Sequence, residues 1–166
     1  WTTCMLFFQV ALFLGYAYAH AVTRYVPPKA QLILHVSLLA AALIFLPIIP
    51  SDTLKPQGSE HPVQRILVLL GLTVGLPYFL LSTTGPLVQA WFAKAYPGRS
   101  PYRLYALSNV GSLLGLLSYP FLVEPALDSY AQSSFWSWGF AIFVVLCGLA
   151  AIYVWRIDRA PPAAAA

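Results

Sequence analysis

The side chains that could do chemistry are few, and most lie inside long apolar segments. Cys4 and Cys147 are isolated from each other and from other metal-binding residues, so they predict no metal site. The carboxylates all fall in predicted loops and accompany no nucleophile motif, so no catalytic residues, no enzyme and no cofactor are predicted. The remaining polar candidates are Gln9, His35, Thr73, Ser82, Thr83, Thr84, Gln89, Ser108 and Asn109.

His35 is a titratable side chain placed early in the apolar segment 30–49, near its basic end. A histidine there could change charge near neutral pH, or it could donate a hydrogen bond to a neighbouring helix. No carboxylate accompanies it in the segment, and a proton relay ordinarily needs such a partner. We interpret His35 as a structural hydrogen-bonding residue, with proton transfer as the alternative.

Asn109 places an amide about one turn inside the apolar segment 104–123. An amide in hydrocarbon needs hydrogen-bond partners, and in an antiparallel pair Thr83 and Thr84 lie at its depth. We therefore expect Asn109 to bridge to these hydroxyls or to backbone freed by Pro86, as an interhelical latch rather than a substrate contact. The candidate substrate-binding residues are Gln9, His35, Thr83, Thr84, Gln89 and Asn109.

The elements that carry these residues are those of a membrane protein. Of the 166 residues, 60% are hydrophobic and 8% are charged, and the mean hydropathy is +0.74. A soluble domain carries roughly 25% charged residues. The net charge of +4 is not gathered into a basic cluster, so no nucleic-acid partner is predicted. The expected partner is the lipid bilayer.

Five uncharged segments are long enough to cross a bilayer, which takes about 20 residues of helix. We predict an all-α polytopic membrane protein with one transmembrane domain over 1–159, followed by a tail at 160–166. The predicted spans cover about 1–22, 30–49, 66–84, 104–123 and 135–155, joined by loops that include the polar stretches 50–65 and 128–134.

The charges between the spans indicate an orientation. Successive loops alternate sides, and seven Lys and Arg residues fall on one side against two on the other. Basic residues collect on the cytoplasmic side of membrane proteins, so this N-terminus is predicted outside and the C-terminus in the cytoplasm. The seven are Arg24, Lys29, Lys94, Arg99, Arg103, Arg156 and Arg159; the two are Lys55 and Arg65.

The third span runs into a Gly85-Pro86 pair that interrupts the apolar run 66–93. As one helix this run would measure about 42 Å, more than the ~30 Å of a hydrocarbon core. Pro86 lacks an N–H, so the helix must kink or end there. We favour a kinked, continuous helix to about residue 96, with Thr83 and Thr84 helping to satisfy the freed carbonyls. A separate interfacial helix is the alternative.

Small residues spaced three and four apart form a stripe along the fourth span. Such stripes let a second helix approach closely in a membrane. We therefore expect a tight helix–helix contact there, and a weaker one at Gly71 and Gly75 of the third span. The stripe comprises Ser108, Gly111, Ser112, Gly115 and Ser118.

Four runs carry a resemblance that covers most of the chain. They are Trp1–Gln9, Gly15–His20, Ser82–Trp91, and Tyr102–Leu113 continued by Tyr119–Pro125. These runs resemble the membrane region of bacterial fused major-facilitator/spermidine-synthase proteins. The resemblance implies a helical part of the inner membrane joined to a soluble aminopropyltransferase-like domain. That domain and the missing transmembrane helices are the implied partners.

The chain is expected to start at the second helix of that family and to lack its nucleotide-binding unit. One further upstream helix would complete six spans, half of a major-facilitator bundle. Two functions follow from the resemblance. The first is a transporter-like module linked to polyamine metabolism, and the second is a non-transporting anchor for the cytoplasmic domain.

Overall fold

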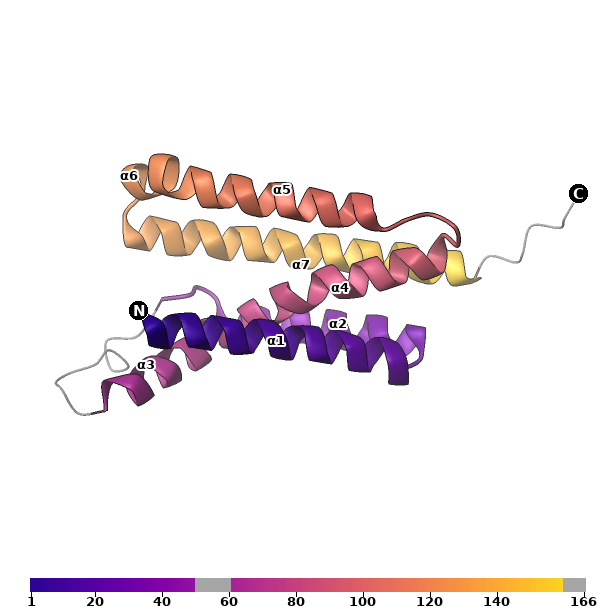
Figure 1. Ribbon diagram of the computed structural model, residues 1–166, viewed down its shortest axis with the longest axis horizontal. Helices are drawn as coiled ribbons and strands as arrows, with labels where there is room; N and C mark the ends of the chain where they lie inside the picture. The colour runs from indigo at the N-terminus through magenta and orange to yellow at the C-terminus, as the bar shows by residue number, and fades with distance from the viewer. Residues whose placement is uncertain (50–60, 160–166) are drawn as a thin grey trace, which may run out of the picture.

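Figure 1 shows the computed structural model, which describes residues 1–49 and 61–159, with side chains through Arg156. Within these ranges the chain is helical and contains no strand, which confirms the all-α class. Five helical segments are long and apolar enough to cross a membrane, in agreement with the predicted number of spans. The predicted loop residues Asp52, Lys55 and Glu60 and the tail at 160–166 lie outside the described residues.

Two π-helical turns join helices directly to one another. Helices α3 and α4 form one continuous segment through a π-helical turn at Gly71–Gly75, and a second such turn at Tyr119–Val123 joins α5 to α6. The elements are α1 (Thr2–Tyr25), α2 (Pro28–Ala42) with a 3-10 turn at Leu43–Phe45, α3 (Pro62–Leu70), α4 (Leu76–Ala95), α5 (Tyr102–Ser118), α6 (Glu124–Ala126) and α7 (Ser129–Arg159).

Proline and aspartate set the helix ends that differ from the predicted spans. The second span stops at Phe45 instead of residue 49, because Leu46 precedes Pro47 and adopts an extended backbone. The stretch 128–134, expected as a polar connection, instead opens α7. Asp128 accepts a hydrogen bond of 2.7 Å from the Ala131 N–H, which caps the helix and lets it start earlier.

Helix α4 continues through Gly85 and Pro86 to Ala95, which agrees with the favoured prediction of a continuous helix. The hydroxyls of Thr83 and Thr84 both donate to the Leu80 carbonyl, at 2.9 and 2.7 Å. The expectation that they satisfy the carbonyl freed by Pro86 is therefore wrong, because that carbonyl belongs to Ser82, four residues before the proline. Both threonines donate to a carbonyl about one turn earlier in the chain, and that Leu80 carbonyl precedes the Ser82 carbonyl that Pro86 frees.

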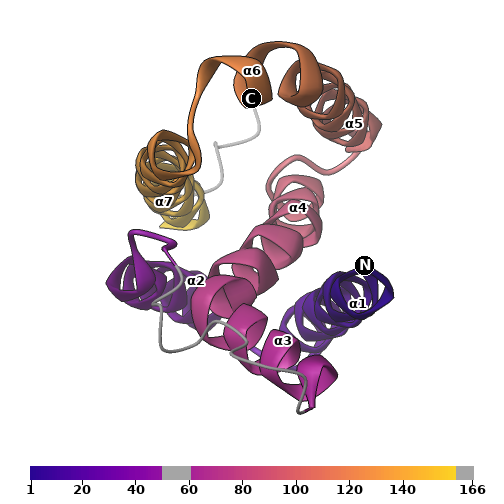
Figure 2. The same cartoon turned by 90° about the vertical axis from the view of Figure 1, so that its left-hand side faces the viewer.

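Four helices form the packed part of the molecule. In Figure 2, α1, α2 and α7 surround the α3–α4 segment. One buried cluster joins α1, α2, α4 and α7, and a second joins α2, α4 and α7. The first comprises Ala19, Val22, Leu32, Leu87, Trp91 and Ala151, and the second comprises Leu39, Ala42, Leu80, Phe140 and Val144.

Helix α5 stands apart from this core. Figure 2 shows it connected through α4 at one end and α6 at the other, away from α1 and α2. None of its residues is buried, and large apolar side chains such as Leu107 and Leu116 are about 70% exposed. Tyr119 donates a hydrogen bond of 3.1 Å to Gln132 Oε1 and so ties the end of this segment to α7. Such an apolar surface suits hydrocarbon or another helix rather than water.

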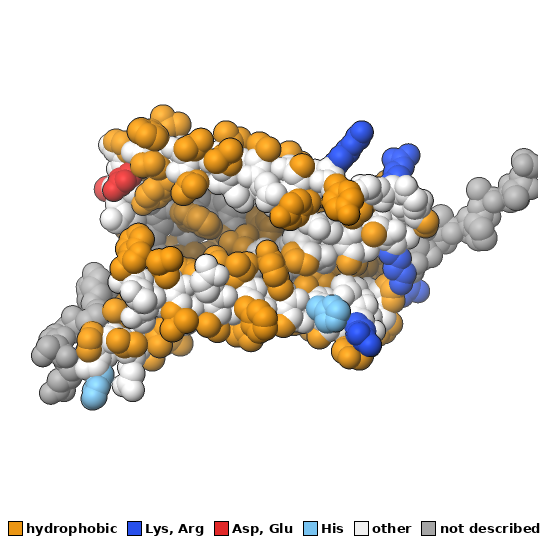
Figure 3. Space-filling model, viewed as in Figure 1, with side chains coloured by type: hydrophobic (Ala, Val, Ile, Leu, Met, Phe, Trp, Pro, Cys, Tyr) orange, Lys and Arg blue, Asp and Glu red, His pale blue; other side chains and the backbone are white. Residues whose placement is uncertain are grey.

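The charged side chains separate toward the two ends of the helices. In the view of Figure 3, Lys and Arg gather where α1 ends and α5 begins, and the acidic side chains lie at the opposite end. We call these the basic end and the acidic end. The acidic end includes Glu124 and Asp128, and the basic end includes Lys29, Lys94 and Arg156.

Candidate functional site

A buried polar contact joins α2 to α4 at the centre of the packed part. The Nε2 atom of His35 lies 2.9 Å from the Thr84 hydroxyl oxygen. His35 is 1% exposed and Thr84 6% exposed, so neither group reaches the surrounding medium. The contact therefore fixes the relative position of the two helices without help from solvent.

The direction of this hydrogen bond follows from the threonine. The Thr84 hydroxyl has one hydrogen and donates it to the Leu80 carbonyl, so it accepts from the Nε2–H of His35. The neutral ring then carries its lone pair on Nδ1. That atom is buried and has no hydrogen-bond partner among the described residues. His35 thus presents one spare acceptor inside the helix bundle.

A second buried pair lies one helical turn away on α2. The indole N–H of Trp91 donates to Gln31 Oε1 at 2.9 Å, and Gln31 Nε2 donates to the Val26 carbonyl at 2.7 Å. The rings of His35 and Trp91 meet edge to face with centroids 6.0 Å apart. This chain of contacts connects α4 through α2 to the end of α1.

Asn109 does not take part in this cluster. Its side chain is exposed on α5, whereas Thr84 bonds to His35 of α2. The predicted latch between Asn109 and the threonines is therefore wrong as to its partner. The reason is that α2, not α5, packs against the buried threonine face of α4.

The other predicted residues are spread over separate surfaces. Gln9 is exposed on α1, and Gln89 is only partly buried on α4, so neither joins His35. The stripe of Ser108, Gly111, Ser112 and Gly115 is exposed along α5. A Cβ atom added at Gly111 or Gly115 would meet nothing within 4 Å, so the expected tight contact is not formed by the described helices.

The close helix contact lies instead between α1 and α4, at Gly15. A Cβ atom there would overlap the Ser82 hydroxyl and come within 3.1 Å of Ser82 Cβ. The Ser82 hydroxyl donates to the Phe79 carbonyl at 2.7 Å, so its position is held. Only glycine lets α1 approach α4 this closely.

A cavity of about 510 Å³ opens between α1, α4 and α7 toward the acidic end. Aromatic rings form much of its wall, and α7 adds hydroxyl and amide groups in the turn that follows Asp128. Figure 3 shows the surface of this side hollowed between α1 and α5. We call this the acidic-end cavity; its lining includes Phe8, Tyr78, Trp136, Phe140, Gln132 and Ser133.

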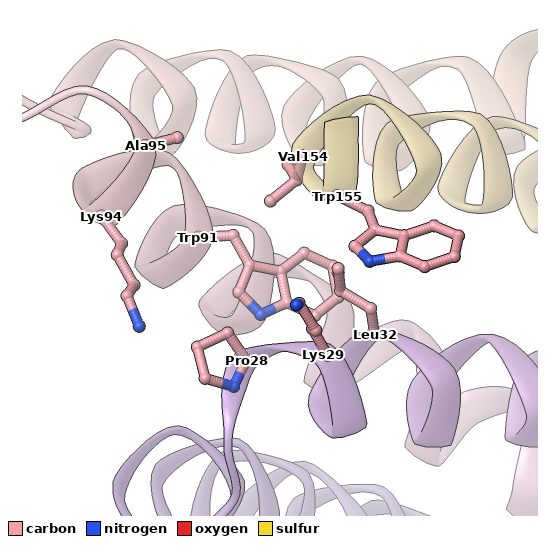
Figure 4. A pocket seen from close by; sticks show the side chains of 8 residues that line it. All are labelled: Pro28, Lys29, Leu32, Trp91, Lys94, Ala95, Val154 and Trp155. Atoms are coloured by element: carbon pink, nitrogen blue, oxygen red, sulfur yellow. The ribbon is translucent and has the colours of Figure 1, made fainter. Parts of the chain in front are cut away.

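A smaller cavity of about 240 Å³ lies at the basic end, between α2, α4 and α7 (Figure 4). Its lining includes Lys29 and Lys94 beside Trp91 and Trp155. Along α4 the order is therefore the acidic-end cavity through Leu81, the closed contact at Thr84, and the basic-end cavity from Trp91. No group of three His, Cys, Asp or Glu side chains gathers as a metal site within the described ranges.

Gln31 and the cavity residues of α7 were not among the predicted site residues. A signal for Gln31 was present, because Gln31 and His35 are four apart and share one face of a helix. Thr84 and Trp91 are seven apart and share a face in the same way. Two pairs of hydrogen-bonding side chains, each on one face of its span, predict two polar contacts between neighbouring helices.

Comparisons with family models, curated proteins and solved structures find no match to this chain. The likeness to spermidine-synthase-fused proteins therefore stays a proposal that rests on the four sequence runs.

Proposed function

We propose that this chain is a transporter-like membrane module of a spermidine-synthase-like fused protein in a bacterial inner membrane, with its basic end in the cytoplasm. One observation carries the proposal: a cavity at the acidic end is separated from a cavity at the basic end by the closed His35–Thr84 contact. Alternating access requires such a closed point between two openings. The charge separation supports the orientation.

The lining of the acidic-end cavity supports a cationic substrate with an apolar chain. Faces of Tyr78, Trp136 and Phe140 attract ammonium groups, and the Gln132 and Ser133 oxygens can accept their hydrogen bonds. A polyamine combines ammonium groups with methylene segments and so matches both kinds of surface. The link to polyamine metabolism rests on this lining together with the resemblance.

The buried histidine supports a contact that opens and closes. In the closed form Nε2 is bonded to Thr84 and Nδ1 has no partner among the described atoms. A buried acceptor without a partner costs free energy, about 1–3 kcal/mol in proteins. Opening the α2–α4 interface would let a substrate ammonium or water donate to Nδ1, which offsets part of the cost of separating the helices.

A non-transporting anchor is the second candidate, and the packing of the same contact favours it. Thr83 and Thr84 are at most 6% exposed, and neither they nor His35 line the two cavities. Interhelical hydrogen bonds of this kind commonly act as glue. In this reading α7 simply carries a soluble domain on the basic side of the membrane.

The test is uptake of radiolabelled spermidine into liposomes that contain the full-length protein. Trp136→Ala removes a ring from the acidic-end cavity, and we expect it to lower uptake about threefold, the scale of one cation–π contact at a partly exposed ring. Trp138→Ala is the matched control, because this ring lies on the same helix but outside that cavity. Absence of uptake with intact aminopropyl transfer would support the anchor instead.

A further inference from the structure

Two positively charged side chains line the basic-end cavity. Lys29 at the start of α2 and Lys94 near the end of α4 both line it, and no carboxylate does among the side chains that the structure describes. In Figure 4 the Lys29 side chain ends beside the Trp91 indole, and the Lys94 side chain extends from the last turn of α4 on the opposite side of that ring. Two ammonium groups around one space repel each other unless an anion lies between them.

The wall between the lysines is rigid. Trp91 is 6% exposed, and its N–H is held by Gln31 Oε1. Leu32 is buried beneath it, and Pro28 fixes the first turn of α2. The indole therefore keeps its place whether or not the cavity is occupied.

An apolar groove of about 290 Å³ continues from this cavity along α2 and α7. Lys29, Leu32 and Trp155 line both spaces, so the groove and the cavity meet at these residues. The groove then follows Ile33 and Val36 on α2 and Gly148 and Ile152 on α7. Gly148 leaves it open, because an added Cβ there would meet nothing within 4 Å.

We propose that the cavity and groove together bind one anionic phospholipid at the basic end. The headgroup phosphate lies between Lys29 and Lys94, and one acyl chain lies along the groove between α2 and α7. Basic pockets between transmembrane helices on the cytoplasmic side bind anionic headgroups by the same electrostatics. A free phosphate would leave the groove empty, and a neutral lipid would leave the two lysines without an anionic partner.

The site has a structural consequence. Lys29 and Leu32 belong to α2, Lys94 belongs to α4 and Trp155 belongs to α7. A lipid bound across them connects three helices at the basic end. The lipid would therefore hold α2, α4 and α7 together at the basic end.

The experiment is native mass spectrometry of the full-length protein from nanodiscs that hold equal amounts of phosphatidylglycerol and phosphatidylcholine with the same chains. We expect phosphatidylglycerol to be retained preferentially. Lys29→Gln and Lys94→Gln should each weaken that retention about fivefold, the scale of one basic residue near an anionic surface. Arg103→Gln is the charge-matched control, since this residue is exposed and lines neither space.

A second pair of variants tests the groove without changing charge. Gly148→Leu fills it and should also lower retention of phosphatidylglycerol, whereas Gly139→Leu, on the same helix in open space, should not. If glycerol 3-phosphate competes as well as the lipid and Gly148→Leu has no effect, the ligand is a free phosphate and the lipid proposal is wrong. If Arg103→Gln weakens retention as much as the lysine variants, or both lipids are retained equally, the site is not specific and the proposal fails.

Discussion

Two glycine-containing surfaces in this molecule look alike in sequence and differ in structure. Gly15 of α1 has so little space that a methyl group would overlap Ser82 of α4. Gly111 and Gly115 of α5, four residues apart and each three residues from a serine, face open space in the described chain. Small-residue spacing thus shows that a close approach is possible, and a partner helix decides whether it occurs.

The difference follows from what surrounds a helix in a membrane. Lipid tails are as apolar as leucine, so apolar surface alone does not drive two membrane helices together. Helices α1, α2 and α4 are held by shape at Gly15 and by buried hydrogen bonds at His35 and Trp91. Helix α5 has neither kind of contact within the described residues, and it packs accordingly little.

The largest expected effect comes from filling the α1–α4 contact. Gly15→Leu introduces a side chain where even Cβ overlaps Ser82, so the helices must separate. We expect a loss of about 3 kcal/mol in unfolding free energy, the upper range for overpacking. The measurement is unfolding of the full-length protein in mixed detergent micelles.

Gly111→Leu is the matched control for this prediction. It lies in open space and replaces glycine by a better helix former, so we expect an unchanged or slightly higher stability. An equal loss at both glycines would contradict the comparison, because it would mean that α5 also packs tightly in the full-length protein.

The next effect concerns the indole that holds α2 to α4. Trp91→Phe removes the N–H that donates to Gln31 Oε1, and Gln31 is only 6% exposed. The amide oxygen is left buried without a partner, which costs about 2 kcal/mol. Trp138→Phe, at a ring that is 73% exposed, is the control and should change the unfolding free energy by less than about 0.5 kcal/mol. Equal losses in both variants would assign the effect to the aromatic ring and not to the hydrogen bond.

A smaller effect is expected at the central contact. Thr84→Val keeps the shape of the side chain but removes the acceptor for His35 Nε2–H, and we expect a loss of about 1 kcal/mol. With His35→Leu added, the double variant should lose less than the sum of the two single variants, because both remove the same bond. Strict additivity would show that the two side chains are not coupled.

Thr73→Val provides the comparison within α3–α4. Thr73 bonds only to the Leu69 carbonyl of its own helical segment, at 2.7 Å, so its loss does not release another side chain. We expect it to cost less than Thr84→Val.

The number of spans follows from the sequence, but which helices pack against one another does not. Long uncharged segments predict five spans, because hydrocarbon thickness sets helix length. The predicted start of α7 was wrong, because Asp128 is typical of a loop and here caps the helix instead.

The site was less predictable than the fold for a physical reason. Asn109 and Thr84 are predicted to lie at similar depths in the membrane, but depth does not identify which helix is the neighbour. Which helix packs beside α4 depends on the three-dimensional arrangement, and α2 takes that place with His35. The placement of Gln31 and His35 on one face of α2, and of Thr84 and Trp91 on one face of α4, carried that information, but only when the two spans are compared with each other.

The smallest expected effect is at Asn109, and it tests directly whether α5 lacks a partner helix. The side chain is exposed on α5, so Asn109→Leu removes no contact that the described residues make. We expect a change below about 0.5 kcal/mol in unfolding free energy and unchanged spermidine uptake. A loss comparable to that of Thr84→Val would show that Asn109 finds a partner in the complete protein. The stripe on α5 would then be a second close helix contact, formed with a helix other than those described, and the contrast with Gly15 would disappear.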